Sequence, residues 1–353
     1  MNYLVSDVSM IHYTCMIVLL LAVGTNASLE FSKDGTFKLL QLTDLHFSRN
    51  LENNLMTLKL MENLIVVENP DLVILSGDVV SGDDWDHTTS GWFESVWSQA
   101  IQPMQKYQIP YAMILGNHDR QGYLTPEQII SNDMRYNTSL TTSRNYYIDV
   151  GDHSRIWMFD SGNNYCNGKR DWGCVDHEAI QWAWKQNVKA HSIAFIHIPI
   201  PQILPKLLSN TVGERHENNC HPKTDNGVMD LAKKHNIKSI HHGHDHGNDY
   251  SGIHDGVMIA YGRVSGYGGY NVDNMIKGAR VILLRENSNY PETWIRLANG
   301  EKILQSTLND VFSKRVHAWI LIVIVVIVNA VGLLYYCFKN APKYSKIVES
   351  MDL

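Results

Sequence analysis

Seven residues with metal-binding side chains follow short apolar segments of the chain, and His118 adjoins one of them. The seven are Asp44, His46, Asp78, Asn117, His197, His244 and His246. Carboxylate oxygens and neutral imidazoles are ligands that suit Zn, Fe and Mn. Each residue alone is ordinary, because Asp-x-His is commonly a turn and a single His is commonly a packed or solvated side chain. Their joint occurrence after successive apolar segments predicts one shared metal site.

The chemistry that this set predicts is hydrolysis assisted by two metal ions. Two cations held a few ångströms apart need a bridging ligand, and a carboxylate has two oxygens to share. Asp78 follows the apolar segment 72–76 and is the natural bridge. A water between two cations loses a proton easily and becomes a nucleophile. The amide of Asn117 adds an oxygen ligand but no negative charge. A further negative charge at this position would repel an anionic phosphate.

Strands that alternate with helices are needed to present these side chains together. We predict strands at 37–42, 72–76, 110–115, 155–159, 192–196, 237–240, 257–261, 279–284 and 293–297. We predict helices at 51–67, 92–107, 177–187 and 227–235, and a further helix that starts at Thr125. In open α/β sheets, ligands bind beyond the carboxyl ends of the strands. Alternation early in the chain and crowded strands late in the chain predict α/β layers with a sheet-rich second half.

The motifs Asp-x-His, Gly-Asp, Gly-Asn-His-Asp, a single His after a strand, and Gly-His-x-His occur here in that order. As an ordered set they resemble the calcineurin-like metallophosphoesterase superfamily. The resemblance runs from about residue 37 to about residue 297, and segments 195–199 and 243–250 look most like the small, purple-acid-phosphatase-related branch. It implies a four-layer α/β/β/α sandwich, here assigned to residues 30–300, with a dinuclear metal centre between the sheets.

The same resemblance implies how the ligands divide between the two metal ions. One ion would be bound by Asp44, His46, Asp78 and His246. The second would be bound by Asp78, Asn117, His197 and His244.

His118 would face the substrate phosphate, and we expect it to donate a proton to the leaving group. One position departs from the family pattern. Purple acid phosphatases place an iron-binding Tyr three residues after the Gly-Asp aspartate, whereas Ser81 stands there in this chain. Phosphoprotein phosphatases have an Asp there that supports the catalytic His, and Asp83 or Asp84 is the candidate for that support here. The identity of the metal ions, Fe, Zn or Mn, is left open.

We therefore expect a metal-dependent phosphoesterase that hydrolyses small phosphate monoesters by attack of a hydroxide bridging two metal ions. The alternatives are a phosphodiesterase acting on nucleotides or phospholipid head groups, and a catalytically silent ectodomain that binds ligands. A formal net charge of −6 and the lack of any Lys/Arg-rich block disfavour nucleic-acid binding. The glycine-rich segment 262–270 lacks the Lys-Ser/Thr ending of a phosphate loop and is expected to form a flexible loop beside the substrate.

Apolar segments near both ends of the chain predict export and attachment to a membrane. Residues 15–23 fit the core of a signal peptide within residues 1–27, and a retained N-terminal anchor is the alternative. Residues 318–338 contain one clearly polar residue, Asn329, and predict a transmembrane helix over 317–338. The expected topology is a single pass, with the catalytic domain extracellular or lumenal and a short cytosolic tail at 339–353.

Glycosylation motifs and cysteines agree with export. Asn26 and Asn137 each begin an Asn-x-Ser/Thr sequon. Cys166 and Cys174 flank a short loop with two glycines and are candidates for a disulfide in an oxidising compartment. This pairing would leave Cys220 without a partner.

Overall fold

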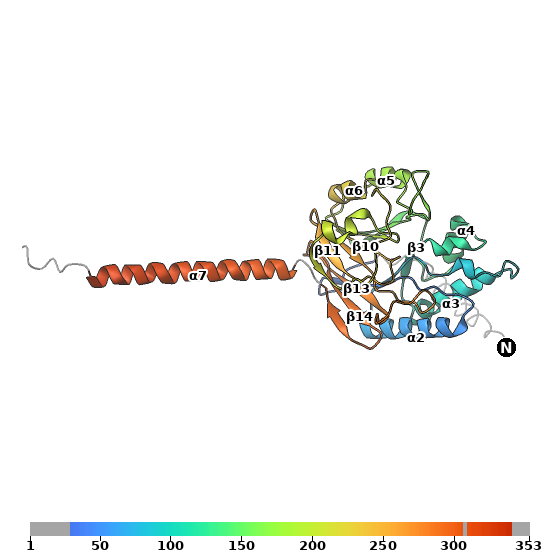
Figure 1. Cartoon of the computed structure of the whole chain (residues 1–353), viewed down its shortest axis with the longest axis horizontal. Coiled ribbons are helices and arrows are strands. Elements are labelled where there is room, and N and C mark those ends of the chain that lie inside the picture. Colours follow the sequence, from blue (N-terminus) through green and yellow to red (C-terminus); the bar gives the residue numbers. More distant parts are fainter. Residues whose placement is uncertain (1–28, 306–308, 341–353) are drawn as a thin grey trace, which may run out of the picture.

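The computed structural model describes residues 29–305 and 309–340 of the 353-residue chain. Figure 1 shows a body of sheets and helices from which one long helix, α7 (Asn309–Asn340), extends. The predicted N-terminal segment 1–27, with its Asn26 sequon, lies outside the described residues. Residues 341–353 of the predicted tail lie outside them as well.

Two large sheets form the centre of the body. The strands of the first sheet are β1 (Thr36–Leu42), β2 (Leu72–Ser76), β3 (Tyr111–Ile114), β13 (Gly278–Arg285), β14 (Glu292–Leu297) and β15 (Lys302–Leu304). The strands of the second are β4 (Tyr146–Val150), β5 (Ser154–Phe159), β8 (His191–Ile196), β9 (Ser209–Val212), β10 (Ile237–His242), β11 (Ser251–His254) and β12 (Val257–Tyr261). The spatial orders are β15-β14-β13-β1-β2-β3 and β4-β5-β8-β10-β12-β11-β9. A small hairpin, β6 (Tyr165–Cys166) and β7 (Lys169–Arg170), stands apart.

The helices cover the outer faces of the two sheets. They are α2 (Leu51–Glu68), α3 (Trp92–Tyr107), α4 (Pro126–Asp133), α5 (His177–Trp184) and α6 (Val228–Lys234). Short 3₁₀ turns occur at Gly82–Asp84, His118–Gln121, Pro201–Ile203 and Pro205–Leu207. In Figure 1, α2 and α3 lie on one side of the sheets and α5 and α6 on the other.

Three clusters of buried side chains fill the spaces between these layers. One joins the first sheet to α2 and α3, and includes Leu64 and Trp97. A second joins the second sheet to α5 and α6. The third lies between the sheets, where Ile74 of β2 and Phe195 of β8 belong to the same cluster. The order of layers is therefore helices, sheet, sheet, helices, as the resemblance implies.

Local sequence explains why the elements begin where they do. Strand β2 is buried at all five residues, which fits a central parallel strand between β1 and β3. Thr125 caps α4 with a full capping box: its side chain accepts from the Gln128 backbone, and the Gln128 side chain accepts from the Thr125 backbone. Helix α3 stays continuous although Pro103 lies inside it.

Helix α7 covers the predicted transmembrane segment, and its side chains from Ile322 to Tyr336 are exposed. Nevertheless, within residues 29–305 and 309–340 no helix is both long enough and apolar enough to cross a bilayer. The predicted membrane span is therefore not confirmed.

Candidate metal centre

The predicted ligand residues meet where strands of the two sheets end. Asp44 and His46 follow β1, Asp78 follows β2, Asn117 follows β3, His197 follows β8, and the remaining two histidines follow β10. Within each sheet these strands run parallel to their partners β1–β2–β3 and β8–β10, so their carboxyl ends share an edge. All seven side chains are buried, and none is more than 8% exposed.

The side chains form two compact groups. Ligand-type atoms of Asp44, His46 and His246 lie within 4.8 Å of one another, and so do those of Asp78, His197 and His244. These six of the seven predicted ligands fall into the two groups that the resemblance implies, with Asp78 in the second group; Asn117 is in neither group.

Asp78 lies between the two groups. Its Oδ2 is 3.1 Å from Nε2 of His197 in the second group and 3.9 Å from Nε2 of His46 in the first. Its Oδ1 accepts a hydrogen bond of 2.7 Å from the backbone N–H of His118. One carboxylate oxygen therefore faces histidines of both groups, which is the position a bridging ligand requires.

Several buried polar atoms lack the partners that burial normally demands. Asn117 Oδ1 and His244 Nε2 accept no hydrogen bond in the described part of the protein. His197 Nε2 lies close to Asp78 but out of hydrogen-bonding alignment with it. The Nε2 atoms of His46 and His246 face each other at 3.2 Å. Buried ligand atoms that converge in this way fit metal ions, so the residues present suit a two-metal centre.

The other ring nitrogen of three histidines is held by a hydrogen bond. His197 Nδ1 donates to the Ser76 carbonyl at 2.8 Å, and His246 Nδ1 donates to the Tyr270 carbonyl at 3.1 Å. His46 Nδ1 shares a hydrogen bond of 2.9 Å with the Ser81 hydroxyl. Such bonds fix the ring orientation and leave Nε2 available as a ligand.

The backbone at the site is strained. Asp44, His46, Asp78 and His244 have φ angles of 53°, 51°, 51° and 79°. Few residues other than glycine adopt this left-handed region, and each such residue costs on the order of 1–3 kcal/mol. Strain of this kind persists where the surroundings over-determine the backbone. The sharp turns after the strands are what aim these side chains inward.

Asp119, which the sequence reasoning did not single out, fastens two of these turns together. Its Oδ2 accepts from the backbone N–H groups of Asp78 at 3.0 Å and Gly116 at 2.8 Å, and its Oδ1 accepts from Val80 at 2.9 Å. Burial, and then the nearby Asp78 carboxylate, raise its pKa to about 6. Asp119 is the last residue of the Gly-Asn-His-Asp motif, and this position could have identified it from the sequence. A buried carboxylate just after a strand has backbone N–H groups within hydrogen-bonding distance.

The electrostatics of the site favour positive charge. Burial alone would lower the pKa of His197, but the Asp78 and Asp44 carboxylates outweigh burial and raise it to about 10. Burial would raise the pKa values of Asp44 and Asp78, but neighbouring histidines outweigh it and hold both values below the ordinary range. The main neighbours are His246 for Asp44 and His197 for Asp78. The carboxylates therefore stay ionised and attract cations.

The glycine-rich segment 262–270 packs directly on the first ligand group instead of forming a free loop. A Cβ added at Gly269 would overlap the rings of His246 and His46, and one added at Gly268 would overlap the His46 carbonyl. Tyr270 then stacks on His246, with ring centroids 3.9 Å apart and an interplanar angle of 3°. The Tyr270 hydroxyl accepts from the His246 backbone and donates to Glu217.

His118 lies at the rim of the centre, with its side chain 35% exposed. Its ring centroid is 5.0 Å from that of His46. Its Nδ1 donates to Gln121 Oε1 at 2.7 Å and lies 3.7 Å from Asp83 Oδ1. Of the two candidates for supporting His118, Asp83 is the one beside it, and Gln121 is the closer partner that the sequence reasoning missed. Its Nε2 makes none of these contacts.

Other histidines of the sequence stay outside the ligand groups. His241 and His242 are fully buried in β10, and burial lowers the pKa of each. His216 lies at the surface beside Glu214.

Cys220 is a free, half-buried cysteine that joins His244 and Asp245 in a further group of ligand-type atoms. Cys166 and Cys174 form a disulfide.

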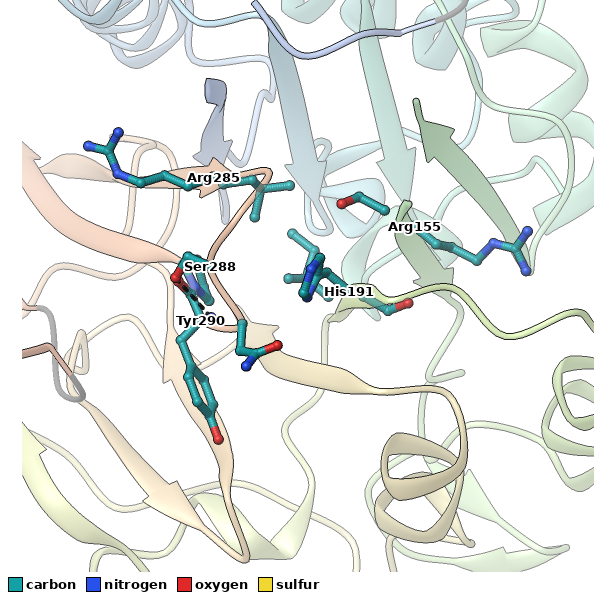
Figure 2. Close-up of a pocket in the computed structure, with 11 residues that line it drawn as sticks. Arg155, His191, Arg285, Ser288 and Tyr290 are labelled. Atoms are coloured by element: carbon teal, nitrogen blue, oxygen red, sulfur yellow. Dashed lines mark hydrogen bonds between the residues drawn. The ribbon is translucent and has the colours of Figure 1, made fainter. Parts of the chain in front are cut away.

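A separate cavity opens at the opposite ends of the strands, near the starts of β5 and β8 (Figure 2). It is lined by Ser154, His191, Ser192, Leu284 and Tyr290, among others. Figure 2 shows the guanidinium groups of Arg155 and Arg285 directed away from it, and they pair with Asp149 and Glu292. The two arginines that line this cavity are therefore paired with carboxylates and not free to bind an anion there.

The fold and the paired ligand groups define the class of protein. The chain belongs to the calcineurin-like phosphoesterase family, whose model matches residues 37–248. It is similar to probable inactive purple acid phosphatase 28 of Arabidopsis thaliana, with 28% identity over 311 residues that cover 73% of this chain and 77% of that protein. It is also similar to phosphatase DCR2 of Saccharomyces cerevisiae, with 24% identity over 79% of this chain and 57% of that protein.

A solved structure has the same architecture. The dimetal phosphatase from Danio rerio aligns with a TM-score of 0.53 at 11% identity, over 77% of this chain and 99% of that one. At this level of identity the likeness supports the fold alone.

Ser81 provides a direct test of how His46 is held. Replacing Ser81 with Ala removes the hydroxyl that holds His46 Nδ1, so the ring is no longer fixed with Nε2 toward the site. We expect Ser81→Ala to weaken zinc binding by about 10- to 100-fold, the usual cost of losing such a partner. Calorimetric titration of the metal-stripped protein measures this loss. Ser131→Ala, at an exposed serine of α4, is the control; equal affinity in both variants would contradict the positioning role.

Proposed function

We propose that this protein is a metal-dependent phosphoesterase that hydrolyses phosphate monoesters. The observation that carries the proposal is the position of the Asp78 carboxylate between two groups of buried ligand atoms. Family membership supports phosphoester hydrolysis in general terms. The preference for monoesters is our inference and rests on the sequence comparison with the purple-acid-phosphatase-related branch.

The residues proposed to hold the first metal ion are Asp44, His46, Asp78 and His246. Those proposed for the second are Asp78, Asn117, His197 and His244. When bound, two such ions would lower the pKa of a water between them and neutralise charge on the phosphate. The protein contributes a dry, pre-shaped cradle, because these side chains are buried and three of the rings are fixed through Nδ1.

His118 is proposed as the proton donor to the leaving group. An alkoxide departs poorly unless it is protonated, and a positioned imidazole supplies that proton. The Nδ1 proton of His118 is held in a hydrogen bond to Gln121. The proton that His118 would donate to the leaving group is therefore the one on Nε2. As imidazolium, His118 also stabilises negative charge that develops on the phosphate.

A catalytically silent, ligand-binding domain is the second candidate. The Arabidopsis thaliana relative is named as probably inactive, which is the observation in favour of this candidate. The complete set of seven buried ligand residues in this chain supports activity instead, since binding alone does not require them all. The next experiment separates the two candidates.

Asp78→Asn tests the two-metal proposal. The substitution keeps the shape of the side chain but removes the charge facing both groups, so both sites weaken together. We expect metal content to fall from about two ions per chain toward none, and nearly all turnover of a phosphate monoester to be lost. Elemental analysis and phosphate release measure these two quantities. Asp152→Asn, at an exposed turn, is the control. Full metal content and rate in Asp78→Asn would refute the proposal, and a metal-loaded wild type that hydrolyses no phosphoester would favour the silent domain.

His118→Ala tests the proton donor. We expect both metal ions to be retained and the rate on alkyl phosphates to fall by about 10²–10⁴-fold. The loss should be much smaller on 4-nitrophenyl phosphate, whose leaving group departs without protonation. His153→Ala, at an exposed histidine of the β4–β5 turn, is the control. Equal losses on both substrates would reject proton donation and leave His118 as a phosphate-binding residue.

We further propose that the domain works in an extracellular or lumenal compartment. The Cys166–Cys174 disulfide supports this proposal, because such bonds persist in oxidising compartments. Asn137 is exposed in the segment between α4 and β4, where a glycosyltransferase has access to its sequon.

Asn137 supplies the corresponding test. When it is expressed with its own N-terminus in a eukaryotic secretory host, the protein should lose mass on enzymatic deglycosylation. Asn137→Gln should lose less mass than the wild type, by the mass of the glycan on Asn137. Mass spectrometry of the peptide containing Asn137 identifies the site directly. An unmodified Asn137 in protein purified from this host would count against lumenal exposure of the domain.

A further inference from the structure

We propose that the segment 163–174, which we term the disulfide hairpin, forms the binding site for the leaving group and selects aromatic phosphoesters that carry an additional negative charge. This inference rests on the proposed function. Its first observation is a contact: the Trp172 ring packs edge-to-face on His244, with centroids 4.5 Å apart and an interplanar angle of 76°. Because His244 belongs to the second ligand group, Trp172 stands at the boundary of the candidate metal centre.

Trp172 also lines a pocket on the hairpin. The other lining residues are Asn164, Tyr165, Arg170 and Asp171. Trp172 is partly exposed, and Tyr165 is 66% exposed. Two accessible aromatic rings line this pocket, and one of them, Trp172, also contacts a ligand histidine. Such rings are suited to contact a planar group attached to the reacting phosphate.

The charge of the pocket narrows the class of leaving group. Tyr165 and Arg170 are directly opposite each other in the β6–β7 pair, so their side chains are neighbours. Within the described chain, no carboxylate forms an ion pair with the Arg170 guanidinium. The Asp171 carboxylate is occupied, since it accepts hydrogen bonds from the backbone N–H groups of Trp172 and Lys223. Among the described residues that line the pocket, Arg170 is the cation without an ion-pair partner, so its guanidinium is available to pair with an anionic substituent.

The hairpin is held in place on both sides of Trp172. Before it, Asp171 binds the Lys223 backbone; after it, Gly173 N–H donates to the Asn163 carbonyl at 2.6 Å. A side chain at Gly173 would overlap the Ser161 backbone, so the close approach requires glycine. Beyond Gly173, Cys174 closes the loop through its disulfide to Cys166.

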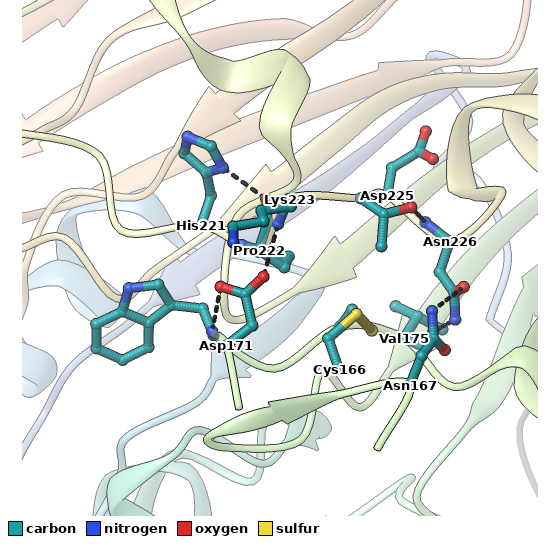
Figure 3. The surroundings of a disulfide bond; sticks show 12 residues. Cys166, Asn167, Asp171, Val175, His221, Pro222, Lys223, Asp225 and Asn226 are labelled. Atoms are coloured by element: carbon teal, nitrogen blue, oxygen red, sulfur yellow. Dashed lines mark hydrogen bonds between the residues drawn. A yellow bond between two sulfur atoms is a disulfide. The ribbon is translucent and has the colours of Figure 1, made fainter. Parts of the chain in front are cut away.

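Figure 3 shows a second fastening between the hairpin and the segment 221–226. The Asn167 side chain donates to Asn226 Oδ1, and the Asn226 amide donates in turn to the Val175 carbonyl. A binding residue is most effective when its own position is fixed beforehand, because less ordering is needed when the ligand arrives. These hydrogen bonds and the disulfide fix the position of Trp172 before a ligand binds.

The experiment compares two substrates and two non-hydrolysable ligands on the metal-loaded full chain. The substrates are 2-naphthyl phosphate and hexafluoroisopropyl phosphate, whose leaving groups have similar acidity but differ in shape. The ligands are 2-naphthylmethylphosphonate and methylphosphonate, whose dissociation constants are measured by calorimetry. We expect the wild type to favour the naphthyl compound in both pairs.

Trp172→Ala should weaken binding of the naphthyl phosphonate and raise KM for the naphthyl phosphate by about 2- to 10-fold. Methylphosphonate and the fluoroalkyl ester should change little, and Trp172→Phe should retain most of the preference. Trp184→Ala, at a partly exposed tryptophan of α5, is the control. A wild type with no naphthyl preference, or equal shifts for both members of a pair in Trp172→Ala, would overturn the proposal.

Arg170 is tested with phenyl phosphate and 4-carboxyphenyl phosphate. Arg170→Gln should remove a carboxylate preference of about 2- to 5-fold, the scale of an exposed ion pair. Lys169→Gln, at the adjacent residue that does not line the pocket, should leave the preference unchanged; equal effects of the two variants would reject the anion-selective part of the proposal. If the wild type hydrolyses nothing but still prefers the naphthyl phosphonate, the proposed function fails while the aromatic site stands.

Discussion

The Asp78 carboxylate imposes the constraint that the rest of the site satisfies. It is buried, it faces histidines from both sheets, and it remains ionised because those histidines are close. A buried charge is costly unless opposite charge and hydrogen bonds compensate for it. Here the His118 backbone binds one oxygen and His197 lies against the other. The arrangement therefore depends on two sheets being held face to face.

The interface between the sheets meets that requirement. Ile74 of β2 and Phe195 of β8 belong to one apolar cluster, and each lies only a few residues before a ligand. Packing between these strands thus sets the separation of Asp78 and His197. The left-handed turns that follow the strands complete the positioning, and burial of the cluster offsets their backbone cost. Stability and function are coupled through the same few strands.

Much of the fold was predictable from sequence where apolar runs end in clear turn signals. The segment 72–76 matches β2 as predicted, and Thr125 with Gln128 marked the start of α4. The strands β4, β9, β11 and β15 of the two large sheets were missed. The last three are only three or four residues long, and β4 is partly exposed at its three central residues. Such strands are stabilised by neighbours in the sheet, which a local pattern does not reveal.

The ligand residues were accessible to sequence reasoning because each follows a strand and has a metal-binding side chain. Their partners were not. Ser81 and Asp119 act through hydrogen bonds that join separate loops, and Gln121 acts within the 3₁₀ turn that carries His118. Trp172 reaches His244 from more than seventy positions earlier in the chain. Residue type alone marks none of them.

The tight packing of the glycine-rich segment has a consequence for the route by which a substrate enters. Gly266, Gly268 and Gly269 lie so close to the turn that carries His46 that no side chain fits between them. That flank of the metal centre is closed by backbone, and Tyr270 covers His246 beyond it. For the phosphoester of the proposed function, the flank where His118 is partly exposed is therefore the approach that remains, with phosphorus entering inward and the leaving group outward.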